Sequence, residues 1–319
     1  MILSNTKEAS KYLPSLNLTV DNDRLTDFFR RAQEWLTSHI IGTDIEALID
    51  PDLEPEEEEP TEPSIEETIE EIEETTEDAT EEDDNEEEDP HAELRTLCQR
   101  VIAERALLDG IPELDLQLTE AGFAVQDNDN FSPASQARVD RLLAKMPERI
   151  AADTDALVRY LLKNSNGTRQ DPNPYDSWRG TDQFKYMTEA FIPLMEQYNK
   201  LALAAFKLTT YEDFYAAIPV MAREMMKVAD YYVSRKEVCR LRELYRDNEA
   251  LQVHRMAIAE LKAVAVAAYA HDTKCARDHA SSARDIMLDD PNNFPMFKDS
   301  PAFTQKSVNL DGGKMVNFL

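Results

Sequence analysis

The amino-acid sequence predicts an all-α protein, on the basis of two patterns and one shortage. Apolar residues recur three and four positions apart along most of the chain, which is the spacing of one buried helix face. No stretch alternates apolar and polar residues in the manner of a half-buried strand. The 319 residues include only 7 glycines, too few for glycine-turned β-sandwiches or for loops that cradle phosphates. We therefore expect helices throughout and no nucleotide-binding fold.

The N-terminal region predicts a short helix followed by a longer one. Residues 7–13 form the first, because Pro14 disfavours helical geometry in the residue before it. The second ends at Gly42, and residues 45–49 predict one or two further helical turns. The buried face of the longer helix is formed by Leu25, Phe28, Phe29, Ala32, Trp35, Leu36 and Ile40.

Most of the negative charge lies in residues 50–89. This segment holds 24 Asp and Glu residues and no Lys or Arg, so it carries −24 of the net charge of −30 and leaves −6 for all other residues. Its four prolines and its uncompensated glutamates predict a long disordered insertion outside the core. Because clustered Lys and Arg are missing, binding to nucleic acid through a broad basic surface is excluded.

The helical pattern resumes after Pro90 and continues to Gly110. Residues 116–130 contain Gly122 with several Asp and Asn residues, and they predict an irregular excursion. Ser132 before Pro133 is typical of a helix start. We expect one helix there and a second over residues 153–163. The turn-forming residues 164–180 then mark the best domain boundary in the chain.

The second half predicts three long helical stretches, each interrupted once. Pro193 is expected to kink or split residues 183–208, a break is expected around Ser234 within 211–246, and another near 271–274 within 249–287. Four parts result. They are a first helical half (1–49 with 90–167), the acidic insertion (50–89), a second helical half (168–288) and an extended tail (289–319).

The two helical halves resemble each other in sequence. A shift of 193 positions pairs Phe28 with Met221 and seven further positions, nearly all of them apolar in both copies. A shift of 156 pairs Ala103-Glu104 with Ala259-Glu260. The smaller second shift is what an insertion in the first copy produces. We therefore predict an internal duplication, although any two amphipathic helices align at some offset.

One group of residues has the composition of a metal site. His271, Cys275 and His279 lie four positions apart along an expected helix, and both residue types bind zinc. No partner for a fourth ligand is evident, and the alternative is a mildly polar helix flank. The three cysteines are widely spaced, which favours neither disulfides nor a zinc knuckle. No catalytic motif is present, so we expect no enzyme activity, no metal and no cofactor.

The C-terminal tail carries apolar anchors on a segment that cannot form a core alone. It either wraps its own domain or inserts into a neighbouring subunit. The candidate contacts with a subunit or partner are Phe294, Phe297, Phe303, Phe318 and Leu319.

Neither membrane insertion nor secretion is expected from the sequence. The longest weakly polar run, residues 257–270, contains Glu260 and Lys262 and is shorter than the roughly 20 apolar residues that span a bilayer. The N-terminus does not have a basic start followed by an apolar core. We expect synthesis in a reducing cytoplasm.

Several segments together resemble an uncharacterised family of phage and prophage proteins of gut anaerobes. They include residues 121–125 (AGFAV) with Asn128 and Asn130, residues 132–135 (SPAS) with Arg138-Val139, residues 281–283 (SSA), Leu288, residues 292–295 (NNFP) and residues 298–300 (KDS). The N-terminal helices are also similar to those of helical head–tail connector proteins, the adaptors of tailed phages. In both, a short first helix precedes an Ala- and Trp-bearing second one.

This resemblance implies a virion structural protein that forms a ring under the portal and performs no catalysis. Its expected partners are further copies of itself and the portal and tail components, with neither sequence-specific nucleic acid nor a membrane. Its expected location is the bacterial host cytoplasm during assembly and then the virion. Two alternatives remain: a cytoplasmic, chaperone-like accessory module whose acidic segment binds basic partners, and a helical metalloprotein that uses His271, Cys275 and His279.

Overall fold

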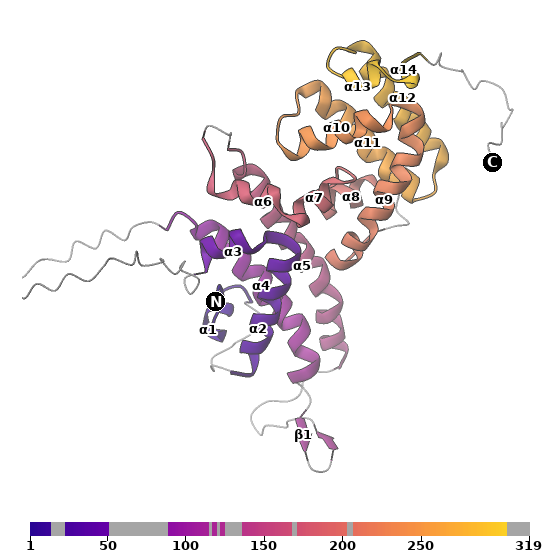
Figure 1. Cartoon of the computed structure of the whole chain (residues 1–319). Coiled ribbons are helices and arrows are strands. Elements are labelled where there is room, and N and C mark those ends of the chain that lie inside the picture. The colour runs from indigo at the N-terminus through magenta and orange to yellow at the C-terminus, as the bar shows by residue number, and fades with distance from the viewer. Residues whose placement is uncertain are drawn as a thin grey trace, which may run out of the picture.

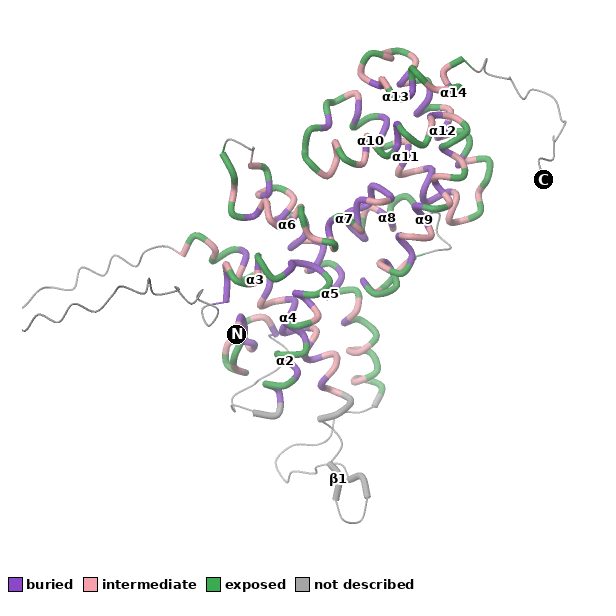
Figure 2. The backbone as a smooth tube through the Cα atoms, viewed as in Figure 1, coloured by how far each residue is buried: buried purple, intermediate pink, exposed green. Residues whose placement is uncertain are grey.

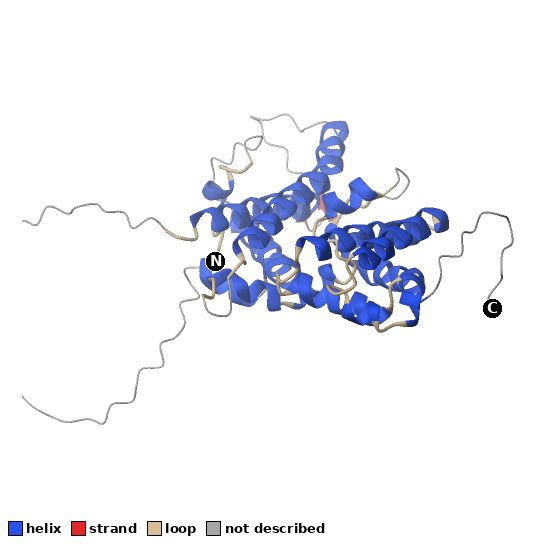
Figure 3. Cartoon of the chain, turned by 90° about the horizontal axis from the view of Figure 1, so that it is seen from above, coloured by secondary structure: helices blue, strands red, loops and turns tan. Residues whose placement is uncertain are grey.

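The computed structural model describes residues 1–13, 23–50, 89–114, 117–119, 122–124, 136–167, 171–202 and 207–304. Across these residues the regular secondary structure is helical apart from one small hairpin, which confirms the all-α class (Figures 1 and 3). Residues 51–88 and 305–319 lie outside the described residues. The predicted disordered insertion and the last part of the tail, with Phe318 and Leu319, therefore remain predictions.

The first half contains the helices α1 (Thr6–Ala9), α2 (Asp23–Leu36), α3 (Thr43–Ile49), α4 (Ala92–Leu114) and α5 (Gln136–Asn164). A π-helical turn, η1 (Thr37–Ile41), continues α2 up to Gly42, where the sequence predicts the helix to end. Helix α4 packs against both α2 and α5, so it forms the centre of this half.

Three boundaries of the first half differ from the prediction. Helix α1 ends at Ala9, because the following residues turn instead and Tyr12 N donates to Ala9 O at 3.0 Å. Helix α4 continues past Gly110. Helix α5 is a single helix where two were expected, with Pro147 inside it. A proline within a helix costs about 3 kcal/mol, and the apolar contacts of α5 with α4 offset this cost.

A short β-hairpin lies between α4 and α5, in the region where the sequence predicts an irregular excursion. Strands β1 (Gln117–Thr119) and β2 (Gly122–Ala124) are antiparallel, with Leu118 opposite Phe123. The expectation of no strand was therefore wrong at this point. Strands of three residues are too short to show a period of two in the sequence.

Short helices connect the two halves: the 3₁₀ turn η2 (Pro174–Asp176), α6 (Ser177–Gly180), α7 (Asp182–Thr188) and α8 (Met195–Leu201). The break between α7 and α8 includes Phe191, whose φ is +58°, and it splits the stretch near Pro193 as predicted. Trp178 is fully buried, and its Nε1 donates to Ile40 O at 2.7 Å. The predicted boundary loop thus contains a side chain that anchors it to the first half.

The second half consists of α9 (Tyr211–Tyr232), α10 (Arg235–Arg246), α11 (Gln252–Tyr269) and α12 (Thr273–Asp289), followed by the short helices α13 (Pro295–Lys298) and α14 (Pro301–Thr304). The breaks before α10 and α12 occur at Ser234 and His271, which have φ values of +72° and +60°. The sequence predicted both breaks.

The two halves repeat one order of helices and one set of packing pairs. In the first, α2 is followed by the short α3 and by two long helices, and α4 packs on both α2 and α5. In the second, α9 is followed by α10 and two long helices, and α11 packs on both α9 and α12. This correspondence supports the predicted duplication. The buried residues form one continuous core through both halves (Figure 2).

The matched glutamates of the proposed repeats have equivalent contacts. Glu104 of α4 forms an ion pair with Arg149 of α5 at 2.5 Å, and Glu260 of α11 contacts His279 Nδ1 of α12 at 2.8 Å. Each glutamate therefore reaches the long helix that follows its own in the chain. Glu104 is only 2% exposed, and its burial raises its pKa to about 7, with a further upward contribution from Asp153 and a downward one from Arg149.

The start of the tail packs on its own chain. Phe294 and Phe297 are fully buried; the Phe294 ring meets His254 edge-on at 5.4 Å, and Phe297 N donates to the buried Glu237 Oε2 at 2.8 Å. Phe303 is half-buried against Phe297. Of the two alternatives for the tail, these residues therefore follow the one in which it wraps its own domain. Phe294 and Phe297 leave no surface for the partner contact expected of them.

A buried carboxylate joins the two halves. Asp155 of α5 is 5% exposed and accepts hydrogen bonds from Met195 N at 3.0 Å and Glu196 N at 2.8 Å, the first amides of α8. The phenol of Tyr211, the first residue of α9, also donates to it. Burial raises the pKa of Asp155 despite these three donors. One side chain thus caps α8 and holds α9 against α5.

We expect Asp155→Asn to lower the free energy of unfolding by about 2 kcal/mol, because a buried cap and its charge-assisted bonds are lost. Tyr211→Phe should cost about 1 to 2 kcal/mol. The loss of unfolding free energy in the double variant should be smaller than the sum of the two single losses, since both substitutions remove the same hydrogen bond between Tyr211 and Asp155. Urea unfolding followed by circular dichroism measures all three. Tyr231→Phe, at an exposed phenol, is the control; strictly additive losses would contradict the proposed link.

The raised pKa of Glu104 predicts a pH-dependent stability. Its folded-state pKa of about 7 lies above its ordinary value of 4.5, so its contribution to stability is complete below about pH 4.5 and is lost as the pH rises through 7. Relative to wild type, the free energy of unfolding of Glu104→Gln should rise by about 2 kcal/mol between pH 5 and pH 8. Urea unfolding across this range measures the gain. Glu148→Gln, at an exposed position of α5, should follow wild type; parallel curves for all three proteins would refute the assignment.

Candidate functional site

The structure does not assemble the metal site that the sequence allowed. Helix α12 begins at Thr273, so His271 lies in the preceding turn with its φ at +60° and is not on the helix that bears Cys275 and His279. The helix starts there because Asp272 accepts a hydrogen bond from Cys275 N at 3.0 Å. His279 contacts Glu260 instead. Within the described residues, no group of three or more His, Cys, Asp and Glu is placed to hold a metal ion.

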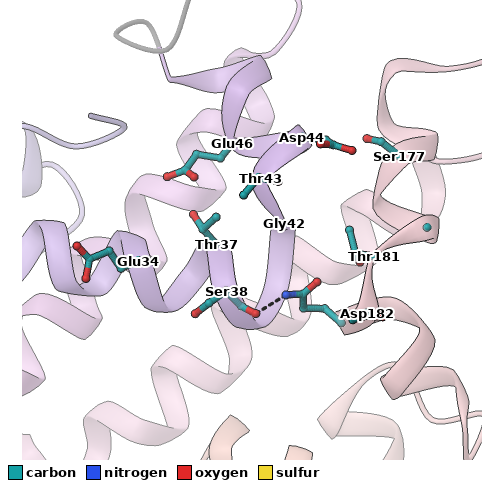
Figure 4. Close-up of a pocket in the computed structure, with 12 residues that line it drawn as sticks. Glu34, Thr37, Ser38, Gly42, Thr43, Asp44, Glu46, Ser177, Thr181 and Asp182 are labelled. Carbon is teal, nitrogen blue, oxygen red and sulfur yellow. Dashed lines mark hydrogen bonds between the residues drawn. The ribbon is translucent and has the colours of Figure 1, made fainter.

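A polar pocket lies where the first half meets the connecting helices (Figure 4). Its volume is about 620 Å³. One wall is the end of α2 with η1 and the start of α3, and the other is α6 with the start of α7. The lining residues are Glu34, Thr37, Ser38, Gly42, Thr43, Asp44, Glu46, Ser177, Gly180, Thr181, Asp182 and Gln183. We call this the seam pocket.

The first wall depends on an irregular turn of the backbone. In η1 the N–H of Gly42 bonds to Thr37 O, five residues back, at 2.9 Å. Gly42 then adopts φ +78°, which L-residues other than glycine rarely adopt, and α3 starts at Thr43. A π-helical turn widens the helix locally and is frequent at functional sites. This turn displays Thr37 and Ser38 together with the first turn of α3.

The second wall is held by contacts that cross the seam. Thr181 Oγ1 caps α7 by accepting from Phe184 N at 3.2 Å, and Gln183 Nε2 donates to Ser38 O across the pocket (Figure 4). Trp178, buried behind this wall, donates to Ile40 O. The two walls are therefore fixed relative to each other, and the pocket is formed before any ligand binds.

The charged residues that line the seam pocket are all acidic. Four lining residues are carboxylates, namely Glu34, Asp44, Glu46 and Asp182, and none of the described lining residues is Lys, Arg or His. Glu46 accepts one hydrogen bond, from Gln33 Nε2 at 2.7 Å, and Arg30 Nη1 lies 3.8 Å from exposed Glu34. Figure 4 shows Asp44 and Ser177 reaching toward each other from opposite walls.

Thr37 is an unusual member of this pocket. It is only 8% exposed, and its Oγ1 has no hydrogen-bond partner within the described part of the chain. A buried hydroxyl without a partner costs about 1 to 3 kcal/mol. Figure 4 shows this oxygen on the same side of η1 as the Glu46 carboxylate. This oxygen is inaccessible to solvent, so it lies behind the pocket wall and does not face the cavity.

The chemistry of the seam pocket is that of binding. Its carboxylates and carbonyls accept hydrogen bonds, and its hydroxyls both donate and accept. A serine or threonine nucleophile needs an adjacent base to be activated, and the only groups of that kind here are carboxylates on exposed or half-exposed positions. What the arrangement offers is an array of acceptors around a cavity.

A second and larger concave surface lies between the end of α9, α10 and the tail helices α13 and α14. Its volume is about 1440 Å³, and we call it the tail groove. Tyr231 and Met296 line it and are 59% and 44% exposed. Its other lining residues have both signs of charge and include the exposed thiol of Cys239.

The sequence did not reveal either surface. Ser38 and Gln183, which face each other across the seam pocket, lie 145 residues apart in the chain, and local periodicity says nothing about such a pairing. The only local signal was Gly42, a glycine directly before Thr43 and Asp44 in a glycine-poor chain. This glycine predicts a helix end, and the structure confirms that end at Gly42.

Fold and pockets together define a helical protein of two halves, with an acidic pocket where the first half meets the connecting helices. Residues 60–187, which are 128 of the 319 residues, match the family of unknown function DUF6712. The match begins inside the acidic segment and ends in α7, so it includes one wall of the seam pocket. No curated protein matches the chain, and no solved structure matches it. None of the helices in the described ranges has the length and apolar character to cross a membrane.

The two glycines of the seam pocket give a matched test of its geometry. A Cβ on Gly42 would lie 2.8 Å from Thr181 Cγ2, whereas a Cβ on Gly180 would meet nothing within 4 Å. Gly42→Ala should therefore cost about 2 kcal/mol of unfolding free energy, from its positive φ and this clash. Gly180→Ala should be neutral or slightly stabilising. Thermal and urea unfolding measure both, and equal effects would contradict the described turn.

Proposed function

We propose that this chain is a virion structural protein of the head–tail connector type, which assembles into a ring beneath the portal and performs no catalysis. The resemblance described above favours this function, and residues 122–124, 281–283 and 292–295 of the resembling segments lie within the described residues. In the structure, the single observation that favours it most is the tail groove. A ring protein needs such a concave, partly apolar surface for its neighbour.

The tail groove has the composition of a protein interface. Tyr and Met are enriched at the centres of interfaces, and charged residues are typical of their rims. Here Tyr231 and Met296 are exposed in the concave part, and Lys227, Asp230 and Asp299 are among the residues around them. Large apolar side chains gathered in a concavity favour contact with another protein over exposure to water.

The groove is also rigid enough for assembly. Helix α13 is fixed to α10 through the bond from Phe297 N to Glu237, and Arg240 Nη1 bonds both Glu237 Oε1 at 2.8 Å and Asn293 O at 3.1 Å. His254 accepts from Leu251 N through Nδ1, so its Nε2 donates to Asn293 O at 3.0 Å. A preordered surface loses less entropy on binding.

A ring also requires that each subunit use two different surfaces. Rings form from heterologous contacts, in which one patch of a subunit binds a different patch of the next. The tail groove lies on the second half, so the first half of the next subunit is the proposed source of the complementary patch. The proposed location is the host cytoplasm during assembly and then the virion.

A second candidate is the chaperone-like accessory module. The observation that favours it is the acidity of the seam pocket, which would add to the 24 acidic residues of 50–89 in binding basic partners. The metalloprotein alternative has no such support, because His271 is off the helix that carries Cys275 and His279.

The full chain should form a closed oligomer in solution. Multi-angle light scattering gives its mass, and negative-stain microscopy shows whether it is a ring. The double variant Tyr231→Glu with Met296→Glu should dissociate it, because two like charges would be buried at the contact. Met256→Glu places the same charge on another exposed apolar residue, in α11 outside the groove, and is the matched control.

The outcomes separate the two candidates. A ring that captures purified portal protein, with dissociation by the groove variant alone, supports the connector function. A protein that stays monomeric at every concentration and binds no portal contradicts it. Capture of basic proteins by that monomer, lost on deletion of residues 51–88, would favour the accessory module instead.

A further inference from the structure

We propose that the tail groove of one copy binds the start of helix α2 of a second copy, through a contact that repeats the one between the two halves of a single chain. This inference rests on the proposed function and deepens it, because it names the surface that the neighbour contributes. Three observations lead to it: the two cavities are equivalent, the end of α2 is covered by the start of α9, and the end of α9 has no such cover.

The tail groove and the seam pocket occupy equivalent positions in the two halves. The shift of 193 carries six of the seven residues in the first wall of the seam pocket onto residues that line the tail groove. A shift of 119 pairs residues 172–184 with 291–303 and carries all five residues of the second wall onto the groove. The matched groove residues are Lys227, Asp230, Tyr231, Arg235, Lys236 and Cys239 for the first wall, and Met296, Asp299, Ser300, Pro301 and Ala302 for the second.

The contacts within the second walls also correspond. In the first half Thr181 Oγ1 donates to Trp178 O at 2.7 Å, and in the second half Ser300 Oγ donates to Phe297 O at 2.7 Å. Each aromatic residue packs on a phenylalanine six positions further on, with ring centroids 4.8 Å apart in the first half and 5.6 Å apart in the second. Two helices that merely share a period of 3.6 residues would not reproduce these bonds. The two cavities are therefore one structural unit that is present twice.

In the first half, the end of the α2–η1 helix is covered from two sides. Gln183 Nε2 of the second wall donates to Ser38 O, and the phenol of Tyr215, in the second turn of α9, donates to His39 O. Carbonyls at a helix end have no partner within the helix, so donors of this kind satisfy them. The start of the first long helix of one half thus covers the end of the first long helix of the other.

In the second half, the matched helix end has neither kind of donor. Ala302 lies at the position of Gln183, and its methyl group cannot donate. Across the described ranges, no side chain donates to the carbonyls of Tyr231 and Tyr232, which correspond to the two covered carbonyls of the first half. The tail groove is also the larger cavity, about 1440 Å³ against about 620 Å³ for the seam pocket. It therefore has room for the segment that covers its counterpart.

A second copy can supply that segment. The contact between the halves is heterologous, because the end of one helix meets the start of another, and a heterologous contact can be repeated from copy to copy. Its counterpart between copies would join the end of α9 to the start of α2, where Thr26 and Asp27 are exposed. The same contact would remove the exposed side chains of Tyr231 and Met296 from water.

The exposed thiol of Cys239 in the tail groove allows a direct test. The full chain with Cys275→Ser is labelled at Cys239 with benzophenone maleimide, since the remaining thiol, Cys98, is buried. Equal amounts of isotope-labelled and unlabelled protein are mixed, irradiated and digested with trypsin. Peptides of mixed isotopic composition should join residues 237–240 to residues 12–24 or 25–30, which include the start of α2. The same label on Cys275 in a Cys239→Ser chain should give none of them.

A variant that supplies the missing donor is the second test. Ala302→Gln gives the second half the counterpart of Gln183, which would compete with the neighbour for the end of α9. The yield of the mixed cross-links should fall about fivefold, the effect of one hydrogen bond on an association constant. Ala259→Gln makes the same change at an exposed position of α11 and should leave the yield unaltered. Circular dichroism verifies folding, and if Ala302→Gln does not fold, the cross-links of the parent chain decide.

The proposal is overturned if the groove forms no cross-links between copies, or if they lead to a surface of the second copy other than the start of α2. It is also overturned if Ala259→Gln and a folded Ala302→Gln give equal yields. A ring that captures portal protein and cross-links elsewhere keeps the connector function without this contact. An assembly that cross-links as expected and binds no portal keeps this contact and contradicts the connector function. A protein that stays monomeric contradicts both.

Discussion

The structure depends on a carboxylate buried at the seam between its halves. Asp155 lies on α5, yet it accepts the hydrogen bonds of the first amides of α8 and of the phenol that begins α9. Helix α8 has only seven residues, too few to be stable by itself in water, so its position is set by this cap and by burial. Because α9 starts the second half, one side chain fixes where that half begins relative to the first. A buried charge is costly unless all its hydrogen bonds are made. Only one relative position of α5, α8 and α9 allows all the bonds to Asp155, so that position is strongly favoured.

The seam pocket is a consequence of the same arrangement. Once α5 and α8 are joined, α6 and α7 must cross the end of α2, and Trp178 fills the space behind them with its N–H on Ile40 O. The π-helical turn leaves that carbonyl accessible and gives α3 its start at Thr43. What remains between these elements is a cavity with backbone ends and short polar side chains on both walls. The acidity of the pocket follows because its two helix starts, at Thr43 and Asp182, both carry carboxylates.

Much of the fold could be predicted from the sequence, because its signals are local. Ser234 and His271 interrupt long apolar periods, and the helices break there. The acidic segment and the turn-rich loop at 164–180 separate the parts, and the shifted Ala-Glu pairs anticipated that Glu104 and Glu260 have equivalent positions. The errors occurred where tertiary contacts outweigh local preference: Pro147 lies inside α5, which packs against α4, and His271 lies in the turn before α12 and not on the helix of Cys275 and His279. Asp155 and Thr37 carried no signal, since their partners, or lack of them, are decided by residues far away in the chain.

Five described residues have a positive φ, and four of them are not glycine. Phe191, Ser234, Asn248 and His271 have positive φ values at the ends of helices, where a reversal of the chain requires them. The turn at Gly42 also ends a helix, but a tighter end without a π-turn would serve that purpose equally well. The wider turn also leaves the buried hydroxyl of Thr37 without a hydrogen-bond partner among the described residues. A buried hydroxyl without a partner lowers stability, and a folded protein tolerates such a cost as long as its total stability stays above the threshold that function requires.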